Sequence, residues 1–290
     1  DMLNNNASAT ATMTIDAASV FALGALNGGG RAFCTTRISL CNTSSLDVAS
    51  MNLLTSDDGG VGYISASNSS VLNCRGSMLI GRAWREKVTF SMDASSQVKV
   101  GGDLKIIGAD AGDPVGVARY SLPLSGTPGV GTFSVGNGIY LAYSDSGSKV
   151  GVTVSTAQGA PASASIAGVL DMSAAGGAWS FFTLDGSSVT FGGNIAMGAN
   201  NSRATVILTN NATLGTSGNL VNRNAPNGQC AIQGSGTINV AGTLYNDGRI
   251  TADGGTLTVS YGVLGQTYSG NDLDLLDGTY EGWYAVNRGR

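Results

Sequence analysis

Histidine is absent from this chain of 290 residues, and its absence removes most of the usual catalytic machinery. Without an imidazole there is no Ser-His-Asp or Cys-His nucleophile pair and no zinc or copper site with a histidine ligand. Acid–base chemistry would therefore depend on aspartate, arginine, lysine or tyrosine. The sequence has no Gly-Lys-Ser/Thr motif and no glycine-rich phosphate loop before a helix, so we predict no nucleotide site.

Paired carboxylates are the remaining signature of a polysaccharide-cleaving enzyme. The clusters of aspartates in the chain are Asp57 with Asp58, Asp110 with Asp113, and the group Asp272, Asp274 and Asp277. The last group lacks the ligand spacing and the distant glutamate of a calcium-binding EF-hand loop. Isolated carboxylates that could face a base are Asp103, beside Lys105, and Asp171, with Arg119 or Arg203 as partners. Outward positions on strands produce such neighbours by chance, so we predict no catalytic, cofactor-binding or metal site and no enzyme.

Four cysteines, at positions 34, 41, 74 and 230, bear on the compartment. An even number of cysteines in a chain of low charge suits an oxidising environment. Cys34 and Cys41 are close enough in sequence to close a small disulfide loop. The alternative is that the cysteines are small buried residues. Because the chain starts with Asp1 rather than methionine, we expect a removed secretion signal and an extracellular location.

The composition favours strands over helices. Glycine contributes 44 residues and charged residues only 12%, while Ser, Thr, Asn and Val are plentiful. The net charge of −4 argues against nucleic acid or an anionic lipid surface as a partner. No apolar run approaches the 18 residues that a membrane-spanning helix needs, so we expect no membrane insertion.

A repeated phrase organises the chain. In its clearest copy, Val98–Ile106, two short alternating segments flank a Gly-Gly step and the second segment begins with a leucine-like anchor. These anchors, separated by 26, 35, 31, 25, 25 and 24 residues, are Met78, Leu104, Ile139, Leu170, Ile195, Leu220 and Leu244. An earlier anchor is predicted at Leu53.

Units of about 25 residues cannot bury their apolar faces alone, and stacking successive units solves this problem. The sequence therefore predicts an all-β solenoid, a parallel β-helix, in which the longer units loop out at one corner over residues 109–119 and 142–161. The alternative is an antiparallel β-sandwich with hairpin turns at Asn27-Gly28, Asn137-Gly138 and Asn227-Gly228. A sandwich gives no reason for the same phrase to return every 25 residues.

The phrases SSQVKVGGDLKIIG, SSVTFGGNIAMG and GSGTINVAGTLYNDGRITADGGTLTV resemble the glycine-rich repeats of secreted bacterial β-solenoids. Autotransporter passenger domains and surface-sorted repeat exoproteins have the most similar patterns. The resemblance covers about residues 69–260 and implies a right-handed β-helix, secretion and a role at the cell surface.

The two ends differ from the repeats. We expect an N-terminal cap and irregular coils over residues 1–68, solenoid repeats over 69–260, and an aromatic tail over 261–290, all in one structural domain. The tail either caps the last coil or pairs with another subunit. Candidate inter-subunit contacts are Thr10, Thr12, Thr14, Ile15, Tyr280, Trp283 and Tyr284.

These features predict a secreted structural subunit that binds copies of itself head to tail in a filament, sheath or surface layer. The alternatives are an adhesin that binds surface glycans and, less favoured, a polysaccharide lyase or hydrolase.

Overall fold

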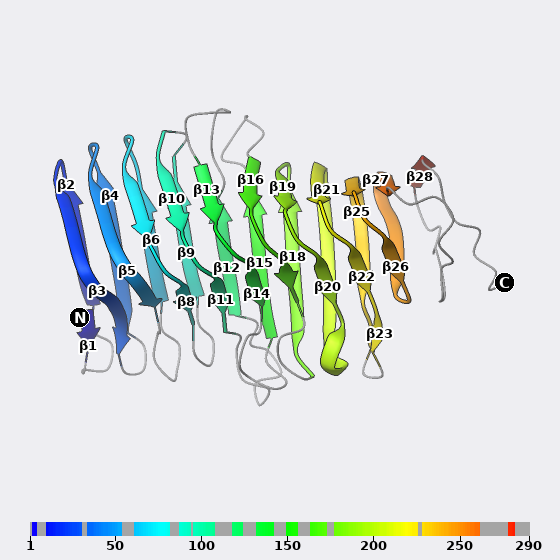
Figure 1. Cartoon of the computed structure of the whole chain (residues 1–290), viewed down its shortest axis with the longest axis horizontal. Helices are drawn as coiled ribbons and strands as arrows, with labels where there is room; N and C mark the ends of the chain where they lie inside the picture. Colours follow the sequence, from blue (N-terminus) through cyan, green and yellow to red (C-terminus); the bar gives the residue numbers. More distant parts are fainter. Residues whose placement is uncertain are drawn as a thin grey trace.

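The chain winds as a β-solenoid whose coils follow one another along the long axis of the molecule (Figure 1). The computed structural model describes residues 2–4, 10–30, 34–53, 61–81, 87–93, 95–107, 118–123, 132–141, 149–155, 163–172, 177–225, 228–261 and 278–281. Within these residues the one helix is a three-residue 3-10 turn, η1 (Ala199–Asn201), and no helix is long and apolar enough to cross a membrane.

Each coil before the last contributes a strand to each of three stacks, which we call the first, second and third in the order the chain meets them, and the last described coil contributes to the first two. The first stack contains β2 (Thr10–Asp16), β4 (Thr35–Cys41), β6 (Val61–Ala66), β9 (Lys87–Met92), β12 (Ala118–Pro123), β15 (Lys149–Ser155), β18 (Trp179–Asp185) and the first parts of β21 (Arg203–Thr216), β25 (Ala231–Val240) and β27 (Arg249–Tyr261).

The second stack contains the first parts of β3 (Ser19–Gly30) and β5 (Ser45–Leu53), then β7 (Val71–Cys74), β10 (Gln97–Val100), β13 (Thr132–Val135), β16 (Ser163–Ile166), β19 (Ser188–Phe191) and the later parts of β21, β25 and β27. The third stack contains the later parts of β3 and β5, then β8 (Met78–Ile80), β11 (Leu104–Ile106), β14 (Ile139–Leu141), β17 (Leu170–Asp171), β20 (Ile195–Met197), β22 (Leu220–Asn222) and β26 (Leu244–Asn246).

Three short elements flank the stacks. β1 (Met2–Asn4) pairs with the end of β3, and β28 (Gly278–Glu281) pairs with β27. β23 (Asn224–Ala225) and β24 (Gly228–Gln229) form a small hairpin. That hairpin is the only antiparallel pairing in the described part of the chain, so the alternative of an antiparallel sandwich is wrong.

The core is a set of continuous columns of inward side chains, because alternate residues of a strand point to the same face. One column of the second stack passes through directly paired residues from one end of the solenoid to the other. Its members are Val20, Leu46, Leu72, Val98, Phe133, Ala164, Val189, Leu214, Ile238 and Val259. The described coils therefore share one continuous apolar core, as the repeat predicts.

The anchors predicted from Met78 to Leu244 pair with one another in register, which confirms the repeat. Leu104, for example, lies between Met78 and Ile139 in the third stack. The anchor predicted at Leu53 is wrong by two residues, since Met51 is the residue that pairs with Met78.

Glycine is needed at the step between the second and third stacks because neighbouring coils approach closely there. A Cβ atom added to Gly101 would lie 2.1 Å from the carbonyl oxygen of Arg75, and one added to Gly136 would lie 2.2 Å from that of Gly101. The Gly102 amide donates to the Gly76 carbonyl oxygen at 2.9 Å, so the step is hydrogen-bonded from coil to coil.

The N-terminal residues are more regular than the sequence predicts. The sequence predicts a cap and irregular coils over residues 1–68, whereas the described strands β2 to β6 pair from coil to coil in parallel register. The repeat is hard to recognise in the second coil because β5 is one continuous strand and has no glycine between its second-stack and third-stack parts. Val48 and Met51 in that coil are three residues apart, whereas their partners Cys74 and Met78 are four apart and flank a glycine.

The longer units also differ from the expected single-corner loops. Residues 118–123 and 149–155 belong to β12 and β15, two paired strands of the first stack, so the extra length is not one continuous insertion. The remainder of the predicted insertions lies outside the described residues.

Candidate assembly surface

The N-terminal end of the solenoid presents strand edges that no described strand covers. β2 pairs with β4 on one side, and β3 pairs with β5, while β1 reaches only Gly28–Gly30 of β3. On the side away from the solenoid, the backbone of Thr10–Asp16 and of Ser19–Leu26 therefore has no strand partner within the described ranges. Such an edge is a template for adding another strand.

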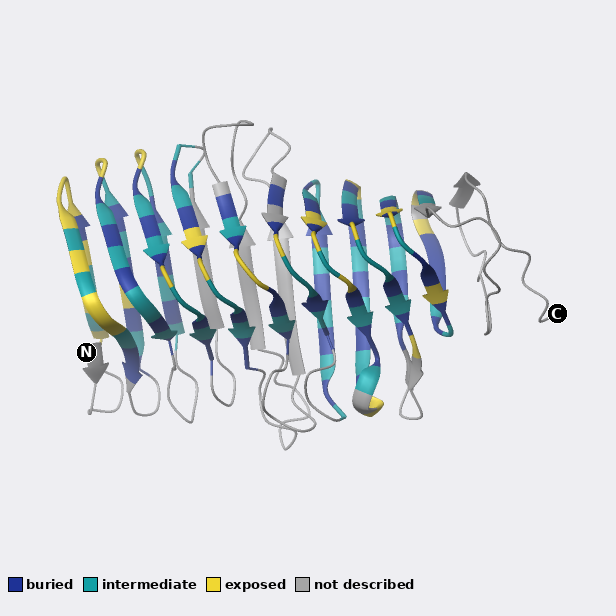
Figure 2. Ribbon diagram, viewed as in Figure 1, coloured by how far each residue is buried: buried dark blue, intermediate teal, exposed yellow. Residues whose placement is uncertain are grey.

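The apolar core is uncovered at this same end. Met13, Val20, Ala22 and Leu26 point toward the core but are only half-buried. Their partners one coil further in are fully buried: Ile38, Leu46, Val48 and Met51. Figure 2 shows the contrast as exposed and intermediate colours on β2 and β3 that give way to buried residues inside the solenoid. The first coil thus lacks the neighbour that every interior coil has.

The predicted contacts on β2 fall on two faces. Thr10, Thr12 and Thr14 are exposed and point outward, whereas Ile15 is 4% exposed and packs in the core. The alternation of the strand separates them, because successive side chains point to opposite faces. Ile15 is therefore a core residue of the first coil, and its contact with another subunit stays a prediction.

Phe21 and Leu23 are the most exposed large apolar side chains among the described residues, at 64% and 81%. Phe21 precedes a bulge in β3 and Leu23 lies in it, because β3 has two residues, Leu23 and Gly24, opposite the single residue Ala49 of β5. The sequence prediction missed both, although bulky residues on both faces of the phrase Ser19–Leu23 are the signal that could have found them.

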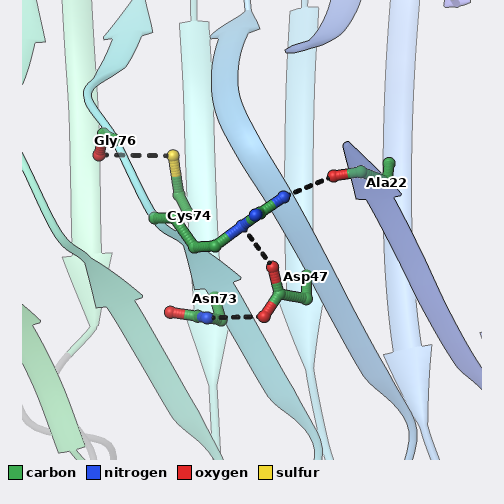
Figure 3. Close-up of polar contacts among 6 residues, drawn as sticks. Ala22, Asp47, Asn73, Cys74 and Gly76 are labelled. Atoms are coloured by element: carbon green, nitrogen blue, oxygen red, sulfur yellow. Dashed lines mark hydrogen bonds and ion pairs between the residues drawn. The ribbon is translucent and has the colours of Figure 1, made fainter. Parts of the chain in front are cut away.

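Arg75 holds this bulge from two coils away. Its guanidinium donates to the carbonyl oxygen of Ala22 at 2.6 Å, pairs with Asp47 at 2.8 Å, and lies 4.7 Å from the centre of the Phe21 ring. The other carboxylate oxygen of Asp47 accepts from the Asn73 side chain at 2.8 Å (Figure 3). A bridge across three coils fixes the position of the edge strand and the ring of Phe21.

The corner between the first and second stacks carries a ladder of amides and carboxylates. Asn42 donates to Asp16 at 2.7 Å and Asn68 donates to Asn42 at 3.1 Å. Asn42 and Asn68 have positive φ values of 54° and 56°, which asparagine tolerates better than most residues. The ladder continues to Asp93, whose carboxylate accepts a hydrogen bond from the backbone N–H of Asn68.

Asp93 lies at the end of this ladder, and its hydrogen bonds favour the ionised carboxylate. Partial burial acts to raise its pKa, but hydrogen bonds from the Asn68 amide, the Ser96 hydroxyl and the Ser95 hydroxyl and amide outweigh burial and lower the pKa. The corner is therefore a structural network whose donors are already used within the protein.

The expected disulfide between Cys34 and Cys41 is not formed, and all four cysteines are free. Strand β4 separates the two residues, and an extended strand of that length holds its ends roughly 20 Å apart. A disulfide requires Cα atoms within about 7 Å. Cys74 is instead buried in the core, where burial raises its pKa to about 11.

Two of the candidate carboxylates lie in the described residues: Asp103, just before β11, and Asp171, in β17. Asp103 pairs with Lys105 at 3.4 Å, and Arg203 stacks on Trp179 at 4.4 Å from the ring centre. The clusters at positions 57–58, 110–113 and 272–277 lie outside the described residues. No group of histidine, cysteine or acidic residues in the described ranges could hold a metal ion.

The C-terminal candidates are described only in part. Tyr280 belongs to β28 and pairs with Leu257 of β27, while Trp283 and Tyr284 lie outside the described residues. A comparison with known proteins finds no family model, no curated protein and no solved structure that matches the chain.

Proposed function

We propose that this protein is a secreted structural subunit that assembles head to tail into an extracellular filament, sheath or surface layer. The observation that carries the proposal is the open first coil, whose unpaired strand edges lie beside half-buried core residues. Another coil placed there would pair the free backbone groups and cover the apolar column that ends at Val20.

The partner that fits this end best is a second copy of the chain. A coil of the same solenoid has parallel strands at the same spacing and an inward column of the same apolar character. Because the two ends of a solenoid are different surfaces, joining one to the other is a heterologous contact that leaves both ends open and continues as a filament.

The exposed side chains at the bulge support the same assignment. Leu23 and Phe21 project from the edge coil, and the bridge from Arg75 holds Phe21 in place before any partner arrives. An apolar contact that is already ordered loses less conformational entropy on association.

Substitution of Leu23 by lysine tests this function. Leu23 is 81% exposed, so L23K should leave folding unchanged while placing a charge in the proposed joint. Thr190→Lys is the matched control, because Thr190 is an exposed outward residue of β19, which lies between other coils and away from both ends of the solenoid. Electron microscopy and sedimentation of a concentration series should show filaments for the wild type and Thr190→Lys, and monomers for L23K. Monomeric wild-type protein at every concentration would refute the function.

A second function, an adhesin that binds glycans, is favoured by the outward side of the second stack. Its outward positions from β19 to β27 carry hydroxyl and amide side chains: Ser188, Thr190, Thr213, Thr237, Asn239 and Thr258. A glycan array probed with wild-type protein and Thr190→Lys tests this function, and equal signals for both would count against it.

A further inference from the structure

β28 lies on the last coil, at the place where a further coil of the solenoid would begin its second stack (Figure 1). It runs parallel to β27 and pairs over four positions, with Tyr280 beside Leu257 and Glu281 beside Thr258. These positions span the corner of the coil and the start of the second stack.

The register of the solenoid shows which residues of a second copy belong at that place. The column that begins at Val20 ends at Val259, so a first coil added to the last would set its Val20 beside Val259. Its Ser19 then falls beside Thr258, and its Ala18 beside Leu257. β28 occupies both positions in the isolated chain.

The first coil cannot avoid this conflict by docking through the first stack alone. A corner of two residues joins β2 to β3, so both strands arrive in the same layer. In the last coil, β28 covers the corner and the start of the second stack, and no described strand pairs with the outer side of Arg249–Ala252.

We propose that β28 is a displaceable plug, which the Ala18–Ser19 corner of the next copy must remove before a head-to-tail joint closes. This inference rests on the proposed function and adds its regulation. Displacement is favoured because an incoming coil can form more strand pairs than β28 does. β28 pairs with β27 over four positions, whereas the first and second coils of the solenoid pair over seven positions between β2 and β4 and eight between β3 and β5.

A reversible crosslink tests the plug in the full chain. Thr256 and Thr279 are paired in register, and adjacent strands lie about 4.8 Å apart, within the Cα separation of about 4.4–6.8 Å that a disulfide spans. The double variant Thr256→Cys/Thr279→Cys should assemble when reduced and stop growing when oxidised. The single variant Thr279→Cys, oxidised in the same way, controls for the four native thiols.

Removal of residues 262–290 is the second test and acts in the opposite direction. The truncated chain should assemble at a critical concentration about tenfold or more below that of the wild type, because a few net hydrogen bonds no longer have to be broken. If the oxidised double variant grows as fast as the reduced one, the plug is wrong while the filament function stands. If neither the wild type nor any variant assembles, the filament function fails and the plug fails with it.

Discussion

Gly234→Ala measures how strictly the stacked coils restrict the backbone. Gly234 lies in β25 at the corner that leads from the first stack to the second, with φ at +115°, a region that L-residues rarely adopt. A Cβ atom there would lie 1.9 Å from the carbonyl oxygen of Leu208 on the neighbouring coil. The contact is with backbone, so no side-chain rotation relieves it.

The expected loss follows from three contributions. Strain at this φ costs roughly 1–3 kcal/mol, and overpacking against a fixed carbonyl costs a further 1–3 kcal/mol or so. Reduced entropy of the unfolded chain offsets about 0.4–1 kcal/mol. Gly234→Ala should therefore lower the free energy of unfolding by about 1–6 kcal/mol.

Gly24→Ala is the matched control, because a Cβ atom at Gly24 meets no heavy atom within 4 Å. Urea denaturation followed by far-UV circular dichroism gives both values, and equal denaturant dependence of the variants checks that the same unfolding event is compared. If Gly234→Ala were as stable as Gly24→Ala, the close approach of coils that underlies the glycine requirement would be refuted.

Two further predictions concern titratable groups. Iodoacetamide at pH 8 should label Cys41 in the folded protein well before Cys74, whose buried thiol has a pKa of about 11, and peptide mass spectrometry that found equal labelling would contradict the packing. The lowered pKa of Asp93 means that its anion stabilises the fold above pH 4 or so and that this stability is lost as pH falls through the folded-state pKa. The difference in urea denaturation midpoint between the wild type and Asp93→Asn should accordingly become smaller from pH 7 to pH 3. A difference independent of pH would show that the corner network does not depend on the negative charge of Asp93.

The repeat could be predicted where each coil repeats the same local chemistry. Anchors such as Leu104 and Ile195 are predicted correctly because each follows a glycine of the step, Gly102 or Gly193, by two residues. The second coil lacks this signal, since β5 passes through the step without a glycine, and its anchor was misplaced at Leu53. The predicted disulfide failed for a related reason: short separation in sequence says nothing of distance once the intervening residues form a strand.

Residue order by itself determined the strand alternation, the glycine steps and the approximate length of a coil, because these are properties of neighbouring residues along the chain. Only the tertiary structure decided that Arg75 reaches Ala22, which is 53 residues away in sequence, and that β28 lies on the corner of the last coil. Such contacts depend on the register between coils and on which edge remains without a neighbour. Insertions of variable length separate the coils, so the register emerges only when the whole column of side chains packs together.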